Sequence, residues 1–313
     1  MHSSAESVAT RPAIEVEGLI KRYDSRTVVD RLSFSIFRGE LFALLGPNGA
    51  GKTTTIEILE GYRRPDAGTV RILGLDPSRD ASELKRRIGV MLQSGGIYPT
   101  ATPQEVLELF ACFYPDPEDP EALLHLVGLD EVRRTRYRYL SGGQQRRLAL
   151  ALALIGKPEV LFLDEPTTGM DPQARRLTWS LLEELKRRGM TILLTTHFLE
   201  EAERLADRVA IIDHGRLIAL STPQELMRLE ADHVTVAAAQ PLDVDELAQL
   251  PSVHRVRELP DGRYVLETDR PIDALAEVTG WARDRRLLLT ELRVGHRSLE
   301  EVFLQLTGSE LRE

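Results

Sequence analysis

The sequence predicts an α/β protein with a second, smaller α+β domain at its C-terminal end. Short, continuous apolar runs are typical of strands buried on both faces of a largely parallel sheet. Such runs occupy residues 41–45, 160–163 and 191–195. Amphipathic helical stretches alternate with β-rich runs from Ile14 to about Leu220, as in α/β domains. Beyond about Leu229 the order of predicted elements becomes β-α-β-β-α-β, the split βαβ arrangement.

The length and composition limit the classes of protein that the chain can represent. Its 313 residues, 42% of them hydrophobic, suffice for two domains with cores of their own. The 40 Lys and Arg residues against 49 Asp and Glu residues give a net charge of −9. This balance disfavours a protein that binds nucleic acid by neutralising its phosphates. Cys112 is the only cysteine, so no intrachain disulfide can form and a reducing cytosol is expected.

The apolar runs of the sequence are too short for a membrane helix. The longest, Leu148–Gly156, is far shorter than the roughly 20 residues that a membrane-spanning helix needs. Residues 1–12 are polar and small, lack the pattern of a signal peptide and are expected to form a disordered lead-in. We therefore expect a soluble chain that takes part in membrane processes only through a partner.

The first domain is expected at residues 13–229, with a helical subdomain at about residues 94–157. Strand signals vanish within this second range, and helical signals dominate. Thr102 fits an N-cap, with Pro103 at the first helical position and Glu105 at the third, so a helix is predicted to begin there.

The second domain is expected at residues 230–313. Its predicted strands cover residues 233–239, 253–259, 263–268 and 287–294, and its predicted helices cover residues 244–250 and 272–285. Ser298 is expected to cap a final helix. His233, His254 and His296 lie in separate predicted elements without the spacing of metal ligands, so no metal site is expected in this domain.

A glycine-rich segment follows the apolar run at residues 41–45 and precedes a helical run. It fits the pattern G-x-x-x-x-G-K-[ST] and consists of Gly46, Pro47, Asn48, Gly49, Ala50, Gly51, Lys52 and Thr53, followed by Thr54. Glycines let backbone N–H groups curl around a phosphate, and a helix N-terminus adds its positive dipole end. Lys52 would bind the β- and γ-phosphates, and the Thr53 hydroxyl would ligate Mg²⁺. The strand–loop–helix order disfavours the alternative of a glycine-rich turn with an incidental lysine.

Two carboxylates and a proline, Asp164, Glu165 and Pro166, follow the apolar run at residues 160–163. Ligands of α/β sheets bind at the carboxyl ends of the strands. Asp164 is expected to hold Mg²⁺ together with the glycine-rich segment, and Glu165 is expected to polarise an attacking water. Taken alone, the pair would fit solvated carboxylates equally well, and the glycine-rich segment favours the catalytic interpretation.

The segment Leu140-Ser141-Gly142-Gly143-Gln144 precedes another predicted helix. Ser141 and Gln144 fit a capping box, which is a purely structural interpretation. The serine hydroxyl and the two glycines also fit a second helix N-terminus that binds phosphate. Because the first glycine-rich segment already covers one side of a nucleotide, this second helix start is expected to close on a nucleotide held by another subunit.

With these motifs the chain resembles the ATP-binding cassette (ABC) family over about residues 14–220. The resemblance implies a P-loop NTPase cassette with a RecA-like core, an antiparallel β subdomain and a helical subdomain. It implies that Tyr23 stacks on adenine and that Gln93 contacts Mg²⁺ and the attacking water. It also implies that Asp171 lies in a loop that crosses to the other subunit and that His197 contacts the γ-phosphate.

The resemblance further implies an ATPase that works as a head-to-tail homodimer with ATP and Mg²⁺. Its catalytic residues would be Lys52, Gln93, Glu165 and His197, and Mg²⁺ would be held by Thr53, Gln93 and Asp164. ATP would be bound by Tyr23, residues 46–54, Gln93, Asp164 and His197. The partner's ATP site would be completed by Ser141, Gly142, Gly143, Gln144 and Asp171. The implied partner is an integral membrane permease in a separate chain at the cytoplasmic face of the cell membrane, and no nucleic acid is expected.

The end of the chain, Gly295–Gly308, is similar to that of ATPases that serve exporters of drugs, antibiotics, lipids or polysaccharides, those of daunorubicin-resistance type. It also fits an ordinary amphipathic helix, and both interpretations can hold. An alternative function is a soluble ABC ATPase that acts on ribosomes or nucleic acid. The single cassette, the lack of sustained heptads and the acidic balance disfavour it. A P-loop kinase would not account for Ser141–Gln144 or His197.

Overall fold

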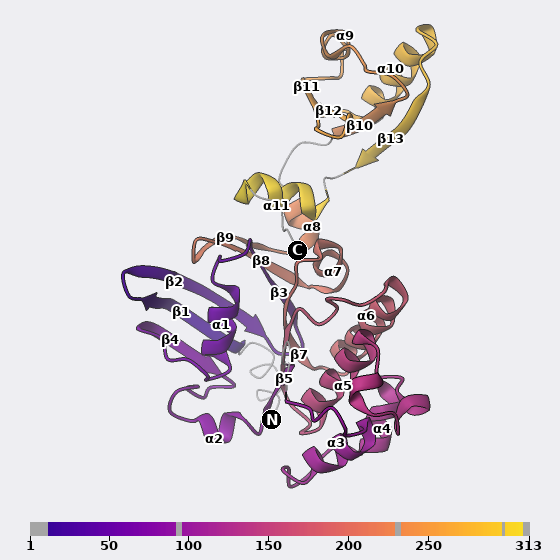
Figure 1. Cartoon of the computed structure of the whole chain (residues 1–313). Helices are drawn as coiled ribbons and strands as arrows, with labels where there is room; N and C mark the ends of the chain where they lie inside the picture. The colour runs from indigo at the N-terminus through magenta and orange to yellow at the C-terminus, as the bar shows by residue number, and fades with distance from the viewer. Residues whose placement is uncertain (1–11, 92–95, 229–232, 296–297, 309–313) are drawn as a thin grey trace, which may run out of the picture. The chain divides into compact units, whose positions relative to one another are not determined.

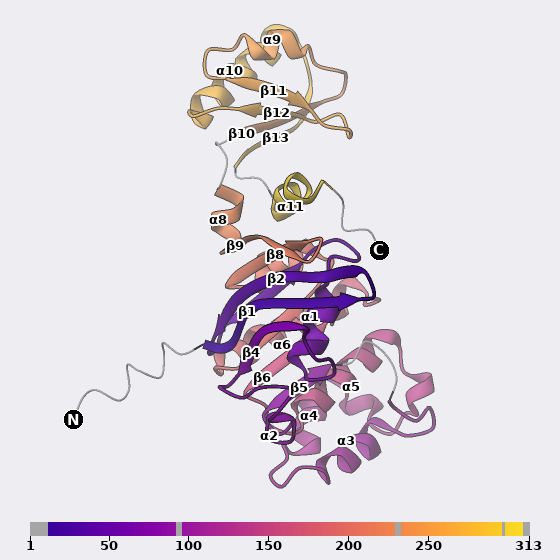
Figure 2. The ribbon, with the colours of Figure 1, turned by 90° about the vertical axis from the view of Figure 1, so that its left-hand side faces the viewer.

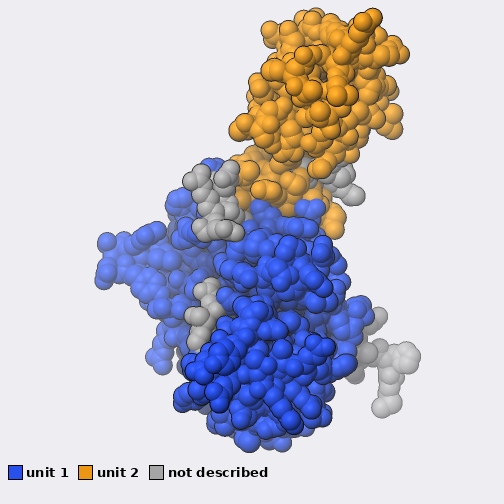
Figure 3. Space-filling view, turned by 45° about the vertical axis from the view of Figure 1, so that its right-hand side comes forward, with its two compact units in different colours: residues 1–223, 306–313 blue, residues 224–305 orange. Residues whose placement is uncertain are grey.

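The computed structural model describes residues 12–91, 96–228, 233–295 and 298–308. The chain divides into two compact units, coloured separately in Figure 3. The first comprises the residues up to Pro223 together with those from Leu306 onward, and the second comprises Gln224–Gln305. The predicted boundary between residues 229 and 230 lies outside the described residues.

The centre of the first unit is a six-stranded sheet with the strand order β5-β6-β7-β3-β8-β9 (Figure 1). Its strands are β3 (Leu41–Leu45), β5 (Ile88–Met91), β6 (Val160–Asp164), β7 (Thr191–Thr195), β8 (Arg208–Asp213) and β9 (Arg216–Ser221). Neighbours from β5 to β8 pair in parallel, and β9 pairs antiparallel with β8. Every side chain of β3 and β7 is buried, which explains the continuous apolar runs and confirms the predicted α/β class.

A second, antiparallel sheet of the first unit has the order β2-β1-β4 (Figure 2). Its strands are β1 (Pro12–Tyr23), β2 (Arg26–Phe37) and β4 (Ala67–Ile72). Side chains of both sheets and of α1 (Lys52–Leu59) share one apolar core, which includes Ile14, Ile56 and Phe162. The shared core fixes α1, and with it the end of the glycine-rich segment, against both sheets. Pro12 is already part of β1, one residue before the predicted start of the first domain.

The described part of the segment between β5 and β6, from residue 96 onward, is helical, as predicted. It contains α3 (Pro103–Ala111), α4 (Pro120–Leu126), two short 3-10 turns (Asp130–Val132 and Tyr137–Tyr139) and α5 (Gly142–Leu154), which lie together in Figure 1. The predicted capping box at the start of α3 is confirmed: the Glu105 N–H donates to Thr102 Oγ1 at 3.3 Å, and the Thr102 N–H donates to Glu105 Oε2 at 2.9 Å. The remaining helices of this unit are α2 (Ala81–Leu84), α6 (Pro172–Arg187) and α7 (Leu199–Leu205).

The second unit contains a four-stranded antiparallel sheet with the order β11-β12-β10-β13. Its elements are β10 (His233–Ala238), α9 (Val244–Ala248), β11 (Arg255–Glu258), β12 (Tyr264–Glu267), α10 (Pro271–Asp284) and β13 (Leu289–Gly295). Chain order and sheet order are those of the split βαβ arrangement, as predicted. The core joins strand residues such as Val234 and Leu266 to Val278 and Trp281 of α10.

Two helices flank this sheet in the sequence: α8 (Pro223–Arg228) and α11 (Leu299–Thr307). The Glu301 N–H donates to Ser298 Oγ at 3.3 Å, so Ser298 caps α11 as predicted. Within the described ranges, no helix is both long enough and apolar enough to cross a membrane.

Candidate functional site

The glycine-rich segment connects β3 to α1, and two of its glycines are required by the space around them. Gly51 has a φ of 101°, and a Cβ there would lie 2.7 Å from the carbonyl oxygen of Val28. A Cβ on Gly46 would lie 2.3 Å from the carbonyl oxygen of Ile212. The backbone at Val28 and at Ile212 therefore lies directly against the outside of the loop. Only glycine allows the loop backbone to take this path.

Lys52 begins α1, and its side chain lies against the same loop. Its ammonium group donates to the carbonyl oxygens of Gly46 at 2.5 Å and Pro47 at 3.2 Å. Burial lowers the pKa of Lys52, whereas the charges of Glu165 and Asp164 raise it. The structure therefore gathers the lysine and both strand-end carboxylates at one place, as the sequence predicted.

The acidic strand end is held by the neighbouring strand β7. Asp164 is the last residue of β6, and one of its carboxylate oxygens accepts a hydrogen bond from Thr195 Oγ1. The N–H of Glu165 donates to the carbonyl oxygen of Thr195 at 3.0 Å. Glu165 has a φ of 50°, a left-handed conformation that costs energy in a residue with a Cβ. Strain of this kind gathers at functional sites, where the surrounding contacts maintain it.

The Glu165 carboxylate has two further neighbours. Its Oε2 lies 3.4 Å from Nδ1 of His197, which follows the end of β7, and it accepts a hydrogen bond from Thr168 Oγ1 at 3.1 Å. A carboxylate between a histidine and a hydroxyl, beside a lysine, has the surroundings of a general base or of a group that orients a water. The structure thus brings together Lys52, Asp164, Glu165 and His197.

Thr53 and Asp164 face a common hollow of about 320 Å³. A hydroxyl and a carboxylate are hard oxygen donors of the kind that Mg²⁺ prefers, so this pair fits the predicted metal. Among the described residues, no group of three His, Cys, Asp or Glu side chains could hold a metal. Mg²⁺ commonly uses only one or two protein ligands together with phosphates and waters, and that mode matches the pair seen here. The third predicted ligand, Gln93, lies outside the described residues.

Glu60 lines the same hollow and was not predicted from the sequence. It is the C-cap of α1 and is only 8% exposed. Burial, together with the nearby charges of Asp164 and Glu57, raises the pKa of its carboxyl to about 8. A protonated carboxylic acid therefore lies beside the candidate metal ligands at neutral pH. In the sequence Glu60 stands at the end of a helix, where nothing distinguishes it from a solvated glutamate.

Tyr23, the predicted adenine-stacking residue, ends β1 and is 38% exposed. Two cations lie near its ring: Lys21 Nζ is 5.5 Å from the ring centroid, and Arg63 Cζ is 5.6 Å from it. An exposed aromatic ring with neighbouring cations is suited to stacking on a nucleobase. Thr54, the last of the predicted phosphate-binding residues, lies in the first turn of α1.

The residues predicted to act on another subunit form a second group. Ser141 is the N-cap of α5 and exchanges two hydrogen bonds with Gln144, so the predicted capping box is confirmed. A Cβ built on Gly142 would lie 3.8 Å from the carbonyl oxygen of Gly169, which places the start of α5 beside the loop that leads to Asp171.

Asp171 itself caps α6. Its Oδ1 accepts hydrogen bonds from the N–H groups of Gln173 and Ala174, both at 2.9 Å. These bonds lower the pKa of the Asp171 carboxyl. A structural role as a helix cap is therefore present alongside the predicted role across a dimer.

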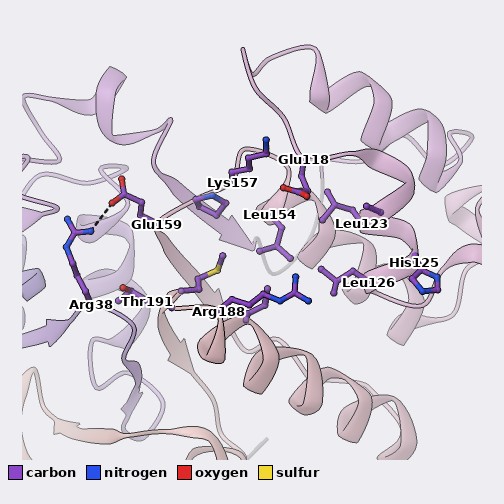
Figure 4. A pocket seen from close by; sticks show the side chains of 15 residues that line it. Arg38, Glu118, Leu123, His125, Leu126, Leu154, Lys157, Glu159, Arg188 and Thr191 are labelled. Carbon is purple, nitrogen blue, oxygen red and sulfur yellow. Dashed lines mark hydrogen bonds and ion pairs between the residues drawn. The ribbon is translucent and has the colours of Figure 1, made fainter. Parts of the chain in front are cut away.

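A separate cavity of about 670 Å³ lies at the other ends of β6 and β7 (Figure 4). Arg38, Leu154, Lys157 and Glu159 are among its lining residues, and Arg38 forms an ion pair with Glu159 at 2.9 Å. Ligand sites of parallel α/β sheets lie at the carboxyl ends of the strands, and this cavity is at the amino ends. The candidate site is therefore the loop after β3 together with the end of β6, and not this cavity.

Comparisons with known proteins are consistent with this geometry. Residues 29–168 match the family model described as ABC transporter, and residues 241–298 match that of the ABC transporter domain-containing protein-like, C-terminal domain. The chain is similar to the Nod factor export ATP-binding protein I of Ralstonia nicotianae, with 42% identity over 98% of this chain and 97% of that protein. It is 39% identical to the protein of the same name from Mesorhizobium japonicum, over 99% of this chain and 91% of that protein.

Solved structures of ATP-binding cassettes are also similar to this chain. An ATP-binding subunit of an ABC transporter is 30% identical, with a TM-score of 0.63 over 69% of this chain and 92% of that one. A dimeric ATP-binding cassette in a post-hydrolysis state, bound to ADP and Pi, is 25% identical, with a TM-score of 0.61 over 67% of this chain and 98% of that one.

Proposed function

The chain belongs to the ABC transporter family as an ATP-binding subunit with ATPase activity, and we propose that a pair of such chains powers a separate export permease. The observation that carries the proposal is the arrangement at the end of β6. There Glu165 lies 3.4 Å from His197 and beside Asp164, and Lys52 is close enough for both carboxylates to affect its pKa. This arrangement suits attack of water on the γ-phosphorus of ATP.

In this proposal each residue has one task. The glycine-rich segment of residues 46–54, through the backbone N–H groups that all of them except Pro47 carry, and the Lys52 ammonium bind the phosphates, and Tyr23 stacks on the adenine. Thr53, Asp164 and Gln93 would hold Mg²⁺, which when bound neutralises phosphate charge.

The chemical step depends on two side chains. Glu165 orients the attacking water and accepts its proton. His197 donates a hydrogen bond to the γ-phosphate. Catalysis is then mainly positioning and charge stabilisation, as expected for phosphoryl transfer.

The second group of residues would complete the ATP site of the other copy. Ser141, Gly142, Gly143 and Gln144 lie at one helix start, and Asp171 begins α6 beyond the adjoining loop. A two-fold dimer would place both elements against the partner's nucleotide and produce two equal sites. The similarity to a dimeric cassette supports this part of the proposal.

We assign the transport direction to export. The C-terminal segment resembles exporter ATPases of the drug, antibiotic, lipid or polysaccharide type, and the similar proteins from Ralstonia nicotianae and Mesorhizobium japonicum carry Nod factor export in their names. The working place would be the cytoplasmic face of the membrane, where the permease binds. Co-purification with a polytopic membrane protein tests this assignment. Stable association with ribosomes or nucleic acid instead would favour a soluble ABC ATPase.

The variant Glu165→Gln tests the catalytic proposal most directly. The amide keeps the shape of the side chain but cannot accept the proton, so ATP binding should persist and steady-state hydrolysis should become undetectable. A nucleotide-bound dimer should then accumulate, measurable by light scattering with and without Mg·ATP. Glu159→Gln is the matched control, because it removes a carboxylate at the opposite end of β6 and should leave hydrolysis near the wild-type rate. Normal turnover by Glu165→Gln would exclude Glu165 from this role.

A further inference from the structure

Glu201 is a buried carboxylate that none of the sequence motifs includes. It lies in the first turn of α7 and has no exposed surface. Glutamates are almost never fully buried unless their carboxylate has partners. Burial raises the pKa of Glu201, while the hydrogen bonds from Trp179 and Thr167 and the nearby Thr196 hydroxyl act in the opposite direction. These partners show what the buried carboxylate connects.

Two of the partners come from separate parts of the cassette. Oε1 of Glu201 accepts a hydrogen bond from Thr167 Oγ1 at 3.0 Å and another from Trp179 Nε1 at 2.8 Å. Thr167 is in the loop after β6, and Trp179 is in the middle of α6. All three side chains are at most 2% exposed, so water does not compete for these bonds.

The loop that Glu201 holds is the one that carries the candidate general base. Thr167 is two residues after Glu165, and the next residue, Thr168, donates to the Glu165 carboxylate at 3.1 Å. By holding Thr167, Glu201 also holds residues 165–168, the short segment in which Glu165 has its left-handed backbone conformation.

The backbone of Glu201 holds the segment that carries the histidine. Its N–H donates to the carbonyl oxygen of Phe198 at 3.0 Å, and Phe198 directly follows His197. On the outer side, the guanidinium carbon of Arg175 lies 3.8 Å from the Phe198 ring centroid. One residue thus connects the loop after β6 with the turn after β7, and those two segments contribute Glu165 and His197.

We propose that Glu201 is a positioning residue for ATP hydrolysis. It holds the loop after β6, which carries Glu165, in a fixed position relative to the turn after β7, which carries His197. In this proposal it acts through Thr167 and Phe198, and not by binding the nucleotide or the attacking water itself. The inference rests on the proposed roles of Glu165 and His197. It adds a prediction that those roles alone do not make: hydrolysis depends on a side chain outside the nucleotide site.

The test is steady-state ATPase kinetics of Glu201→Ala and Glu201→Gln beside the wild type. Glu201→Ala should lower kcat about tenfold or more and leave KM and the Kd for ATP within about twofold, because displacement of a catalytic group affects the chemical step. Glu201→Gln keeps one carbonyl oxygen for the two donors and should restore most of kcat. Glu200→Ala, which changes an exposed neighbour on the same helix, is the matched control and should behave as the wild type.

A second series keeps the test decisive if Glu201→Ala folds poorly. Thr167→Val removes one donor while keeping the size of the side chain, and it should lower kcat in the same direction without changing KM. The double variant Thr167→Val/Glu201→Gln should be about as slow as Thr167→Val alone, because Thr167→Val has already removed the bond that the Gln carbonyl oxygen would weaken.

Three results would overturn the proposal: wild-type kcat in both Glu201→Ala and Thr167→Val, additive losses in the double variant, or no recovery in Glu201→Gln relative to Glu201→Ala. A wild-type protein without ATPase activity would instead refute the proposed function itself, so the two failures are distinguishable.

Discussion

The two tryptophans of the chain lie in different units and show how differently those units use buried polar groups. Trp179 is 2% exposed and donates from Nε1 to Glu201, a carboxylate without exposed surface. Trp281 is 8% exposed and donates at 3.1 Å to Glu246, whose side chain is 40% exposed and also pairs with Arg285. The first unit thus places a carboxyl group inside its fold, and the second unit leaves the equivalent group at its surface.

Among the described residues, the pKa shifts that burial mainly causes all belong to the first unit. In the first unit, burial is the main cause of the shifts of Lys52, Glu60 and Glu201. In the described part of the second unit, the shifted groups, such as Asp261 and Asp269, lie at the surface, and hydrogen bonds are the main cause. Buried, shifted groups gather where chemistry is done. The comparison therefore places the chemistry in the first unit and gives the second unit the character of an ordinary folded module.

The largest expected effect comes from removing the cation of the glycine-rich loop. Lys52→Ala should lower the rate of ATP hydrolysis about a thousandfold, or ~4 kcal/mol, because the group that stabilises the phosphate charge is lost. Arg263→Ala removes a cation of the second unit that pairs with Asp261 at the surface, and it should leave the rate unchanged. Comparable losses in both variants, measured by phosphate release, would contradict the division between the units.

The next effect concerns the core of the second unit. Trp281→Ala should lower the free energy of unfolding of that unit by about 3 kcal/mol, because it leaves a cavity beside Val234 and Val278. It also leaves Trp179 as the only tryptophan, so fluorescence then reports on the first unit alone. The Trp179 transition in urea should keep its midpoint, while circular dichroism should detect an earlier transition. A shift of the Trp179 midpoint would mean that the units do not unfold independently.

The difference between the units also explains what the sequence could predict. Several of the predicted features are local patterns, whose meaning depends on a few consecutive residues. They are the glycine-rich loop, the carboxylates at the end of β6, and the capping boxes at Thr102 and Ser141. The split βαβ order of the second unit followed from alternation and turn residues alone, and it was correct to within a few residues at each element. Local physics determines these features, so they are visible in the sequence.

Glu60, Thr195 and Glu201 escaped prediction for the opposite reason. Each matters through neighbours that are distant in the chain: Glu201 lies 34 residues from Thr167 and 22 from Trp179, and Thr195 lies 31 from Asp164. Burial of a glutamate on a short helix leaves no periodic signal, because Glu200, Glu201 and Glu203 look alike in the sequence. Only the packing of α7 against α6 and the loop after β6 separates the buried member from its exposed neighbour Glu200.

The last expected effect depends on the pH and would refine the comparison further. Burial raises the pKa of Glu60 from 4.5 to about 8, so between these values the folded state retains a proton that the unfolded chain has lost. The resulting contribution to stability is fully present below about pH 4.5, declines as the pH rises and is lost above about pH 8. Glu60→Gln carries a neutral amide at every pH and should therefore be more stable than the wild type by about 4 kcal/mol at pH 8 and by less than about 1 kcal/mol at pH 5.

Urea unfolding at the two pH values, followed by Trp179 fluorescence in the Trp281→Phe background, measures this difference in the first unit. Glu83→Gln, which changes a glutamate with a 65% exposed side chain, is the control and should follow the wild type at both values. Glu60 lies in the first unit, and the shifted groups of the second unit lie at the surface. A pH-dependent gain in stability should therefore appear in the Trp179 transition. It should not appear in a Trp281 transition, recorded in the Trp179→Phe background. An equal gain at pH 5 and pH 8 would mean that Glu60 is ionised in the folded protein, and the hollow beside Thr53 and Asp164 would then already carry the charge of a third carboxylate.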